Sequence, residues 1–488
     1  MASATGPRFE EAAAAWVERN RDQPGRLRTF LKAMPKGADL HSHLSGAVFA
    51  EEYLQWAAED GYCLERQSLR LIAPERCSRD PSLLPAARVV QDGGLYGQVL
   101  DQWSTRDASG SSHAGHADFF RAFAGFSALS SQPRRQGSMV AAVANRAAAQ
   151  SIRYLELMIT VNGDPVRTLG RTIPWTGSLE AAHSALLGRG MPSLVSDGRQ
   201  QLEALSRATQ KTLGCGSASA QPGCSVTVRF LQQTRRNQQP QDVFAQFVYA
   251  FELAHASEQV VGINLVGPED HPLSLQDYTL QMHMLRWLRQ RYPAVPIALH
   301  AGELTLNLAP PEQLAFHIRE AVEIAGARRI GHGVAISFER HAAQLMALMA
   351  HLRVLVELCL TSNEVILGVK ETDHPLLDYQ AANVPTALAS DDEGVLRTDL
   401  TEQFLLAVRR YRLDYRALKR LARNSLEYSF LPGPSLWESD AYQARITACR
   451  SLQPISSACE GFLASSAKAH QQWQLELELH QFEQQALP

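Results

Sequence analysis

Four residues of this 488-residue chain could together bind one metal ion. His41 and His43 form an H-x-H pair in an apolar run, and residues two apart on a strand point to the same face. His300 ends a second apolar run and Asp391 ends the last one. Three imidazoles and one carboxylate suit Zn²⁺ and leave room for a water. An H-x-H pair alone also arises by chance, but the four residues together predict a site for one zinc ion per chain.

Three further residues could act on a substrate beside that ion. Glu303 lies three residues after His300, close enough to reach the site without binding the metal. A partly buried carboxyl group there would have a raised pKa, so it could donate a proton and later accept one. His332 lies between two glycines that let the backbone approach a ligand, although it could also be an ordinary core histidine. Asp392 follows Asp391, points differently and is free to bind substrate.

Eight apolar runs must position these side chains, and they cover residues 38–44, 151–160, 225–233, 260–267, 296–303, 328–334, 353–362 and 384–392. Their near-continuous apolar character is typical of strands that are covered on both faces, as in a parallel sheet. Amphipathic stretches at 275–292 and 311–326 lie between runs and predict helices. Eight strands alternating with helices predict an α/β fold, the (β/α)8 TIM barrel.

Polar side chains fall at the ends of these runs or just past them. They are His41, His43, Glu156, His300, Glu303, His332, Asn363, Asp391 and Asp392. Barrel enzymes carry their chemistry at the C-terminal face, because loops from all eight strands converge there. We therefore expect these polar groups to form one site.

The chain divides into an N-terminal helical segment at 1–33, the barrel at 34–434 and a helical tail at 435–488. Two connections, about 60–140 and 161–224, exceed the usual short loops of a barrel. The second is rich in Gly, Ser and Pro. We interpret both as insertions over the C-terminal face rather than as independent domains.

Composition excludes several classes of protein. The formal net charge is only −3, from 47 basic and 50 acidic residues, so we expect no nucleic acid and no membrane as partner. No apolar run approaches the ~20 residues that span a bilayer. The first sixteen residues lack the basic start and apolar core of a signal peptide, which predicts a cytoplasmic protein.

Six of the seven cysteines form close pairs in the sequence. They are Cys63 with Cys77, Cys215 with Cys224, and Cys449 with Cys459, whereas Cys359 stands alone in an apolar run. No pair has the CxxC spacing of a cysteine-ligated metal. The pairs could be disulfides of a periplasmic or secreted protein, or reduced thiols that fall near each other by chance. The compartment therefore stays open.

Six motifs, in this order, resemble the adenosine deaminase family of the metal-dependent amidohydrolase superfamily: MPKGADLHSHLSGA, VVGINLVGPE, LHAGE, RIGHG, LTSNE and ALASDDEGV. The first of them and ARNSLEYSFL look closest to the adenosine deaminase growth factor branch. The resemblance runs from about residue 34 to residue 430. It implies a zinc-dependent hydrolase that converts adenosine to inosine and ammonia, and, by analogy with that branch, a homodimer.

The same resemblance implies a role for each site residue. His41, His43, His300 and Asp391 would bind zinc, Glu303 would protonate purine N1, His332 would orient the hydroxide and Asp392 would bond purine N7. The backbone of Gly267 would contact purine N3. Phe119, Phe120 and Phe123 resemble an apolar helix that lids the pocket, and they read equally well as the face of an ordinary amphipathic helix.

Ser45 departs from the family pattern, which usually has an acidic residue there to bind the ribose 5′-hydroxyl. Serine is shorter and uncharged, so the 5′ end would be held less tightly. This keeps a second substrate class open, another aminopurine or a 5′-modified adenosine such as methylthioadenosine. A third interpretation is an extracellular nucleoside-binding or signalling protein. The partner in each case is a small purine nucleoside.

Overall fold

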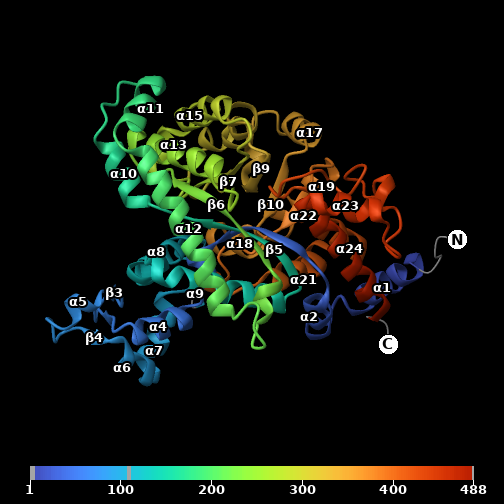
Figure 1. Ribbon diagram of the computed structural model, residues 1–488, viewed down its shortest axis with the longest axis horizontal. Helices are drawn as coiled ribbons and strands as arrows, with labels where there is room; N and C mark the ends of the chain where they lie inside the picture. The colour runs from blue at the N-terminus through green and yellow to red at the C-terminus, as the bar shows by residue number, and fades with distance from the viewer. Residues whose placement is uncertain (1–5, 107–111, 486–488) are drawn as a thin grey trace.

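Eight parallel strands form one sheet at the centre of the computed structural model, which describes residues 6–106 and 112–485 (Figure 1). In sheet order they are β1 (Gly37–His43), β5 (Ile152–Ile159), β6 (Thr227–Arg235), β7 (Val260–Val266), β8 (Ile297–Ala301), β9 (Arg329–His332), β10 (Leu355–Leu358) and β11 (Thr386–Leu388). A parallel bridge between Ser42 and Asp391 brings the last strand back to the first. The (β/α)8 barrel is confirmed, and each strand lies within two residues of an apolar run or inside it.

Helices follow every barrel strand and cover the sheet. After β6 comes α13 (Pro240–Ala256), after β7 come α14 (Pro272–Gln276) and α15 (Tyr278–Arg291), and after β8 come η2 (Gln313–Ala315), α16 (His317–Glu320) and η3 (Ala321–Ala325). After β9 come η4 (Val334–Phe338) and α17 (Ala342–Leu352), and after β10 come α18 (Leu360–Leu367), η5 (Glu371–Asp373) and α19 (Leu376–Ala381). After β11 come α20 (Glu393–Leu396), α21 (Leu400–Tyr411) and α22 (Tyr415–Glu427). The helix expected at 275–292 is present, whereas the one at 311–326 is broken into short pieces.

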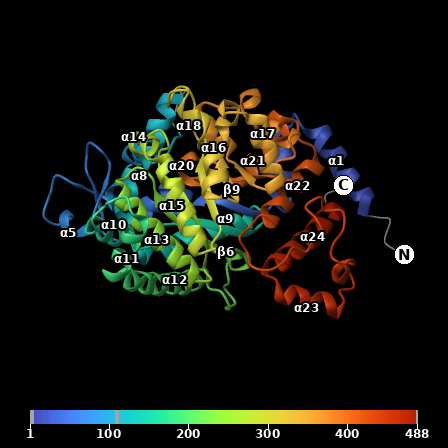
Figure 2. The ribbon, with the colours of Figure 1, turned by 90° about the horizontal axis from the view of Figure 1, so that it is seen from above.

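The first insertion follows β1 and contains α3 (Leu44–Ala47), α4 (Ala50–Glu59), β2 (Cys63–Leu64), β3 (Leu71–Ile72), α5 (Pro74–Cys77), β4 (Leu84–Pro85), α6 (Ala86–Gln91), α7 (Gly93–Gln102), α8 (Ser112–Ser130) and α9 (Pro133–Ala149). Its three short strands pair antiparallel in the order β3-β2-β4, and a disulfide joins Cys63 to Cys77. This part projects from the barrel in Figures 1 and 2. Trp103 ties it to α8: its buried indole N–H donates to the Leu69 carbonyl at 2.9 Å, and its ring packs edge-on against Phe126 of α8.

The second insertion is helical despite its glycines. It contains α10 (Gly163–Arg171), α11 (Leu179–Gly188), α12 (Met191–Leu213) and η1 (Pro222–Ser225), and a disulfide joins Cys215 to Cys224. Here α12 lies against α9 and α13 (Figure 1). Residues of α10 act on the end of β6, as described below.

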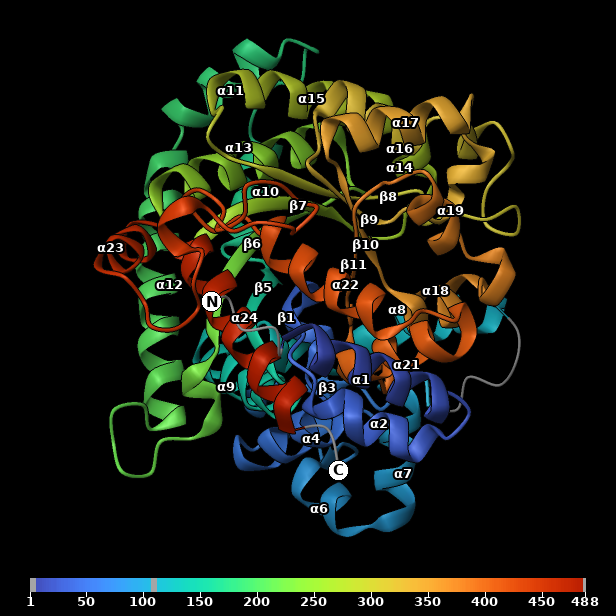
Figure 3. The same cartoon turned by 90° about the vertical axis from the view of Figure 1, so that its right-hand side faces the viewer.

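The two ends of the chain meet on the outside of the barrel. They form α1 (Gly6–Asn20), α2 (Pro24–Ala33), η6 (Thr447–Cys449), α23 (Ser457–Ser465) and α24 (Ala467–Gln485), with a disulfide from Cys449 to Cys459. In Figure 3, α1, α22 and α24 lie in front of the strands, and they contact one another. Residues 1–5, 107–111 and 486–488, which fall in the N-terminal segment, the first insertion and the tail, lie outside the described residues.

All three cysteine pairs whose state the sequence left open form disulfides in the structure. Cys359 is the free cysteine among the described residues. Within residues 6–106 and 112–485, no helix combines the length and apolarity that crossing a bilayer requires.

Candidate metal centre and substrate cavity

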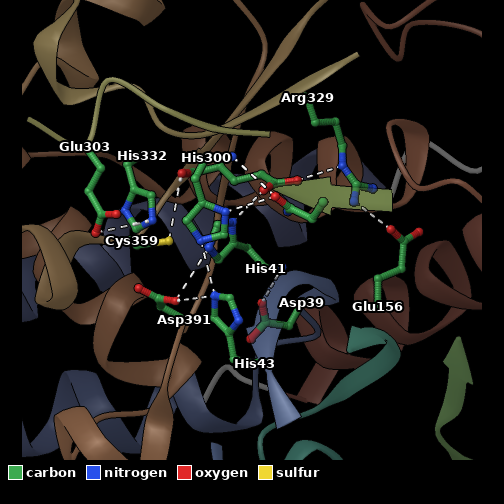
Figure 4. Close-up of polar contacts among 12 residues, drawn as sticks. Asp39, His41, His43, Glu156, His300, Glu303, Arg329, His332, Cys359 and Asp391 are labelled. Carbon is green, nitrogen blue, oxygen red and sulfur yellow. Dashed lines mark hydrogen bonds and ion pairs between the residues drawn. The ribbon is translucent and has the colours of Figure 1, made fainter. Parts of the chain in front are cut away.

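Four ligand atoms converge at the C-terminal end of the barrel (Figure 4). Nε2 of His43 lies 3.2 Å from Nε2 of His300, and Oδ1 of Asp391 lies 3.5 Å from Nε2 of both His41 and His43. Donors about 2.0–2.1 Å from a tetrahedral zinc ion stand roughly 3.3–3.4 Å apart. The donor set therefore fits zinc in chemistry and in spacing, and the buried Nε2 of His41 has no hydrogen-bond partner in the described residues.

Each of the three imidazoles is oriented through its other ring nitrogen. Nδ1 of His41 contacts Glu357 at 2.7 Å, Nδ1 of His43 contacts Gln233 at 3.0 Å, and Nδ1 of His300 contacts Asn264 at 2.9 Å. The contacted atom is an oxygen in every case, so Nδ1 donates and the lone pair of Nε2 points at the shared centre. These three hydrogen-bond acceptors, Glu357, Gln233 and Asn264, were not predicted from the sequence.

A buried ionic chain runs from His41 toward the opposite end of the barrel (Figure 4). Glu357 bridges His41 and Arg329, with 2.6 Å between its Oε1 and Nε of Arg329. Nη2 of Arg329 lies 2.7 Å from Glu156, whose other oxygen accepts the backbone N–H of Phe430. Burial opposes the charge of Glu357, yet Arg329 and His41 keep its pKa below the ordinary value. Glu156 thus lies in the middle of β5, and its predicted position at a strand end was wrong. The apolar residues around it gave no sign that it pairs with Arg329 inside the barrel.

A second, overlapping set of groups has the same compactness. His41, His332, Cys359 and Asp391 each offer one ligand atom within 4.8 Å of the others. Burial, followed by the charges of Asp391 and Glu357, raises the pKa of the Cys359 thiol well above its ordinary value. Because a thiolate is the form that binds metal, the set of three histidines and Asp391 fits better.

Glu303 lies beside the metal ligands and is mostly buried, with 12% of its side chain exposed. Its Oε1 lies 3.6 Å from Nε2 of His332. Burial, with smaller contributions from the carboxylates of Asp391 and Glu269, raises the pKa of Glu303 to about 8. A carboxyl group that stays protonated near neutral pH can give a proton to a substrate.

Glu269 holds the loop that carries Glu303, and sequence reasoning missed it. Its two oxygens accept the backbone N–H groups of Gly302 and Glu303 at 3.1 and 2.8 Å. His317 and Arg236 contact the same carboxylate at 2.6 and 3.6 Å. Burial opposes its charge, but Arg236 and His317 lower the pKa of Glu269 to about 2. Glu269 therefore stays ionised and fixes the position of the loop that carries Glu303. In the sequence, the only sign of this role is a carboxylate directly after VGP.

His332 ends β9 in a left-handed conformation, with φ at 66°. That region is unfavourable for a histidine and is often found at functional sites. Nδ1 of His332 contacts Asn363 at 2.9 Å, and Asn363 in turn contacts His374 at 2.9 Å. The buried Nε2 has no hydrogen-bond partner in the described residues and faces Glu303.

Asp391 and Asp392 divide two tasks between adjacent residues. Asp391 also has a positive φ, of 62°, which turns its carboxylate toward the histidines. The carboxyl of Asp392 is buried against Gly46, where any Cβ would overlap Oδ1 of Asp392. Burial and the neighbouring charge of Asp391 raise the pKa of Asp392 well above its ordinary value. A neutral carboxyl group in this position can donate a hydrogen bond.

A cavity of about 370 Å³ opens above the metal ligands. Its wall includes Phe119, Phe120 and Phe123 of α8, together with Ser45 and Gly267. Gly267 follows β7 with φ at 95°, a conformation that favours glycine. The cavity is also lined by His43, Gln233, Arg235, Asn237, Val266, Pro268, His300, Glu303, His332, Asp391 and Asp392. All the residues expected to bind substrate therefore reach one cavity.

Comparison with known proteins gives a consistent picture of the family. The model of the adenosine deaminase family matches residues 106–436. An aminodeoxyfutalosine deaminase of Streptomyces coelicolor is 33% identical over 178 residues, which cover 36% of this chain and 42% of the relative. An adenosine deaminase of Enterococcus faecalis is 30% identical over 184 residues, 37% of this chain and 49% of the relative. The matched stretches span about half the length of these curated relatives.

Solved structures share the fold. The Arabidopsis N6-mAMP deaminase MAPDA is 21% identical, with a TM-score of 0.55 over 83% of this chain and 96% of that one. An amidohydrolase of Burkholderia ambifaria, with bound Zn, is 18% identical, with a TM-score of 0.51 over 83% of this chain and 88% of that one. These similarities support the barrel fold.

Proposed function

Because the chain belongs to the adenosine deaminase family, we propose that it catalyses zinc-dependent hydrolytic deamination of adenosine, or of a close 6-aminopurine nucleoside, to inosine and ammonia. One observation carries the proposal. Four ligand atoms within 4.8 Å of one another lie beside a buried carboxyl group with a raised pKa. This combination supplies both an activated water and a proton donor.

In the proposed mechanism, His41, His43, His300 and Asp391 hold the zinc ion. Zinc bound there lowers the pKa of water toward neutrality and so supplies the nucleophile. Glu303 protonates purine N1 as C6 is attacked, and His332 orients the attacking water through its Nε2. The 6-amino group takes one proton from the attacking water and leaves as ammonia, and the other proton of that water returns to Glu303. The hydrogen bonds of Glu303 and His332 stabilise charge that develops during the reaction.

Two groups at the cavity wall would recognise the purine ring. N7 is a hydrogen-bond acceptor, so a protonated Asp392 matches it as a donor. The backbone N–H of Gly267 would contact N3, and the missing side chain leaves room for the base. Phe119, Phe120 and Phe123 would cover the apolar surface of the nucleoside.

The test is deamination of adenosine by zinc-loaded protein, followed by the change in ultraviolet absorbance and by release of ammonia. Glu303→Gln should lower the rate of both signals by about 10²- to 10⁴-fold while zinc stays bound. Glu312→Gln serves as the matched control, since Glu312 is an exposed carboxylate in the same loop after β8. If adenosine and other 6-aminopurine nucleosides are left unchanged by the zinc-loaded protein, the proposed function is wrong.

Ser45 favours a second substrate class, because a neutral, half-buried side chain lines the cavity and leaves space at the 5′ end. Adenosines with a modified 5′ group, such as methylthioadenosine, would then be accepted. A comparison of adenosine with 5′-deoxyadenosine and methylthioadenosine tests this. Far lower kcat/KM for both modified nucleosides would exclude it.

We also propose that the protein works in an oxidising compartment, since three disulfides are features of exported proteins. Counting free thiols in protein isolated without reductant gives the test. One buried thiol, from Cys359, is the expected count, and seven would contradict the proposal.

A further inference from the structure

The outer end of the cavity carries a cation that pairs with no carboxylate in the described residues. Arg235 is the last residue of β6 and lines the cavity. Its backbone N–H donates to Gln246 at 3.2 Å, but its guanidinium has no ion pair with any residue that the structure describes. The neighbouring Arg236 differs, since its guanidinium is buried and bonds the carbonyls of Leu265 and His300.

The strand geometry places Arg235 outward from the metal ligands. Gln233 contacts His43, and residues two apart on a strand share a face. Arg235 lies two residues further toward the mouth of the barrel, which moves its Cα about 6–7 Å out from Gln233. Its register partner is Val266, the last residue of β7, directly before Gly267. Arg235 therefore belongs to the rim of the cavity.

The acidic and basic side chains of the cavity lie at different depths. Its carboxyl groups, on Glu303, Asp391 and Asp392, all belong to the inner end. Two further side chains that line the cavity, Ser45 and Asn237, are neutral hydrogen-bonding groups, and neither makes a side-chain hydrogen bond with any described residue.

The nearest charges outside the rim do not neutralise Arg235. Asp164 and Arg167 of α10 pair with each other, and both act on Arg235 through space. Burial, followed by repulsion from Arg167, lowers the pKa of Arg235 from its ordinary value, although a guanidinium remains charged at neutral pH. The Arg235 side chain is exposed at this end of β6, so an incoming anion can reach its guanidinium.

We infer that the rim binds an anionic group at the 5′ end of a purine nucleoside, with Arg235 as the main contact and Ser45 and Asn237 as neutral donors. The inference rests on the proposed function, because C6 at the metal directs the 5′ end of the ribose outward. A phosphate monoester and a carboxylate share this chemistry, since both accept two hydrogen bonds from a guanidinium. Arg235 is thereby a specificity-determining residue.

The experiment compares kcat/KM for adenosine, adenosine 5′-monophosphate and adenosine 5′-carboxylate in the zinc-loaded protein. We expect at least one anionic substrate to exceed adenosine, and the better of the two identifies the phosphate or the carboxylate. In Arg235→Met the ratio of anionic to neutral kcat/KM should fall about 10- to 100-fold, as for loss of a charge-assisted contact. Arg235→Lys should keep part of the ratio.

Arg199→Met, which removes an exposed arginine from α12, is the matched control and should keep the wild-type ratio. Zinc content and circular dichroism show whether each variant is folded. Deamination of adenosine with no preference for either anion, and no change of the ratio in Arg235→Met, would overturn the inference and leave the proposed function standing.

If no nucleoside is deaminated, binding measurements still test the anion site separately from the proposed reaction. Calorimetry with Glu303→Gln should then show adenosine 5′-monophosphate or the 5′-carboxylate binding about 10-fold or more tightly than adenosine, and Arg235→Met in that background should remove the difference. This result would support the anion site although the reaction is wrong. Equal affinity for all three ligands would overturn the anion site as well.

Discussion

The inner and outer ends of the cavity are built in opposite ways. At the inner end, His41, His43 and His300 each have a fixed partner on Nδ1, and the ligand atoms are held at zinc spacing. At the outer end, the side chains of Ser45, Arg235 and Asn237 make no hydrogen bond with any other side chain in the part of the chain that is described. The inner groups are preorganised for one ion and one reaction, whereas the outer side chains are left without protein partners among the described residues and can bind a substrate.

This contrast follows from what each end must do. Preorganised dipoles accelerate a reaction because they need no rearrangement when charge develops, and that requires buried, fully partnered groups. A rim that selects among substituents gains affinity only from groups that the substrate itself satisfies. We therefore expect substitutions at the inner end to change activity much more than substitutions at the outer end.

The largest effect should come from the ligand set, because two overlapping sets are present. His300→Ala should remove zinc and lower kcat/KM by on the order of 10³-fold or more, since the activated water is lost. Cys359→Ala should keep one zinc ion per chain. Metal analysis of both purified variants decides the matter, and loss of zinc in Cys359→Ala alone would assign the metal to the set with His332.

The next effect concerns the proton on Glu303. Glu303→Gln should lower kcat by about 10²- to 10⁴-fold with zinc retained. Because the reaction needs the protonated acid, wild-type activity should fall as pH rises through the pKa of Glu303, which burial raises to about 8. The residual activity of the variant should lack that basic limb. A pH profile of kcat/KM checks this, and an unchanged limb would assign it to another group.

A smaller effect should follow from weakening the support of one ligand. Glu357→Gln keeps the shape of the side chain but removes the charge between His41 and Arg329. Metal affinity should fall about 10- to 100-fold. The free energy of unfolding should fall by about 3 kcal/mol, because Arg329 loses a buried partner. Competition with a chelator and denaturant unfolding measure the two quantities.

The control for that variant is Glu323→Gln, which breaks an exposed ion pair with Arg319 at helical spacing. Its unfolding free energy should change by less than about 1 kcal/mol. Equal losses in the two variants would show that the buried chain to Arg329 contributes no more than a surface pair.

The smallest effect should come from α8, the helix that lines the cavity with Phe119, Phe120 and Phe123. His116 of α8 lies 3.2 Å from Asp270, near the end of β7. Burial opposes the charge of His116, but Asp270, and more weakly Glu303, raise its pKa above the ordinary value. The attraction is therefore present at low pH and lost as pH rises through the raised pKa. KM should increase a few-fold between about pH 6 and pH 8, and Asp270→Asn should remove that increase.

The inner end could be predicted from the sequence because its residues interrupt apolar runs. His41, His300 and Asp391 are polar side chains inside buried strands, which few other roles explain. Their supports were harder to find. Glu357 also interrupts an apolar run, but a single carboxylate gives no sign of its partner, and Glu156 shows that such a carboxylate can equally belong to an interior ion pair.

The outer end and the second insertion could not be predicted for physical reasons. Arg235 and Asn237 belong to a polar stretch that reads as a solvated turn. The connection 161–224 is rich in glycine, yet Gly170 and Gly198 lie inside helices. A Cβ on Gly170 would lie 2.9 Å from Ala245, and one on Gly198 would lie 2.2 Å from the Tyr249 hydroxyl. These glycines allow close packing against α13, and composition cannot distinguish that role from flexibility.

The bridge between Ser42 and Asp391 has a consequence for the order in which the chain assembles. Two backbone hydrogen bonds, from Asp391 N–H to the His41 carbonyl and from His43 N–H to the Asp391 carbonyl, join the two edges of the barrel there. The metal ligands stand on both sides of this seam, so an ion would fasten the first strand to the last. All four ligands could then bind the ion only after the barrel has closed. In a chain without the ion, we expect backbone amide hydrogens to exchange first where these two edges meet.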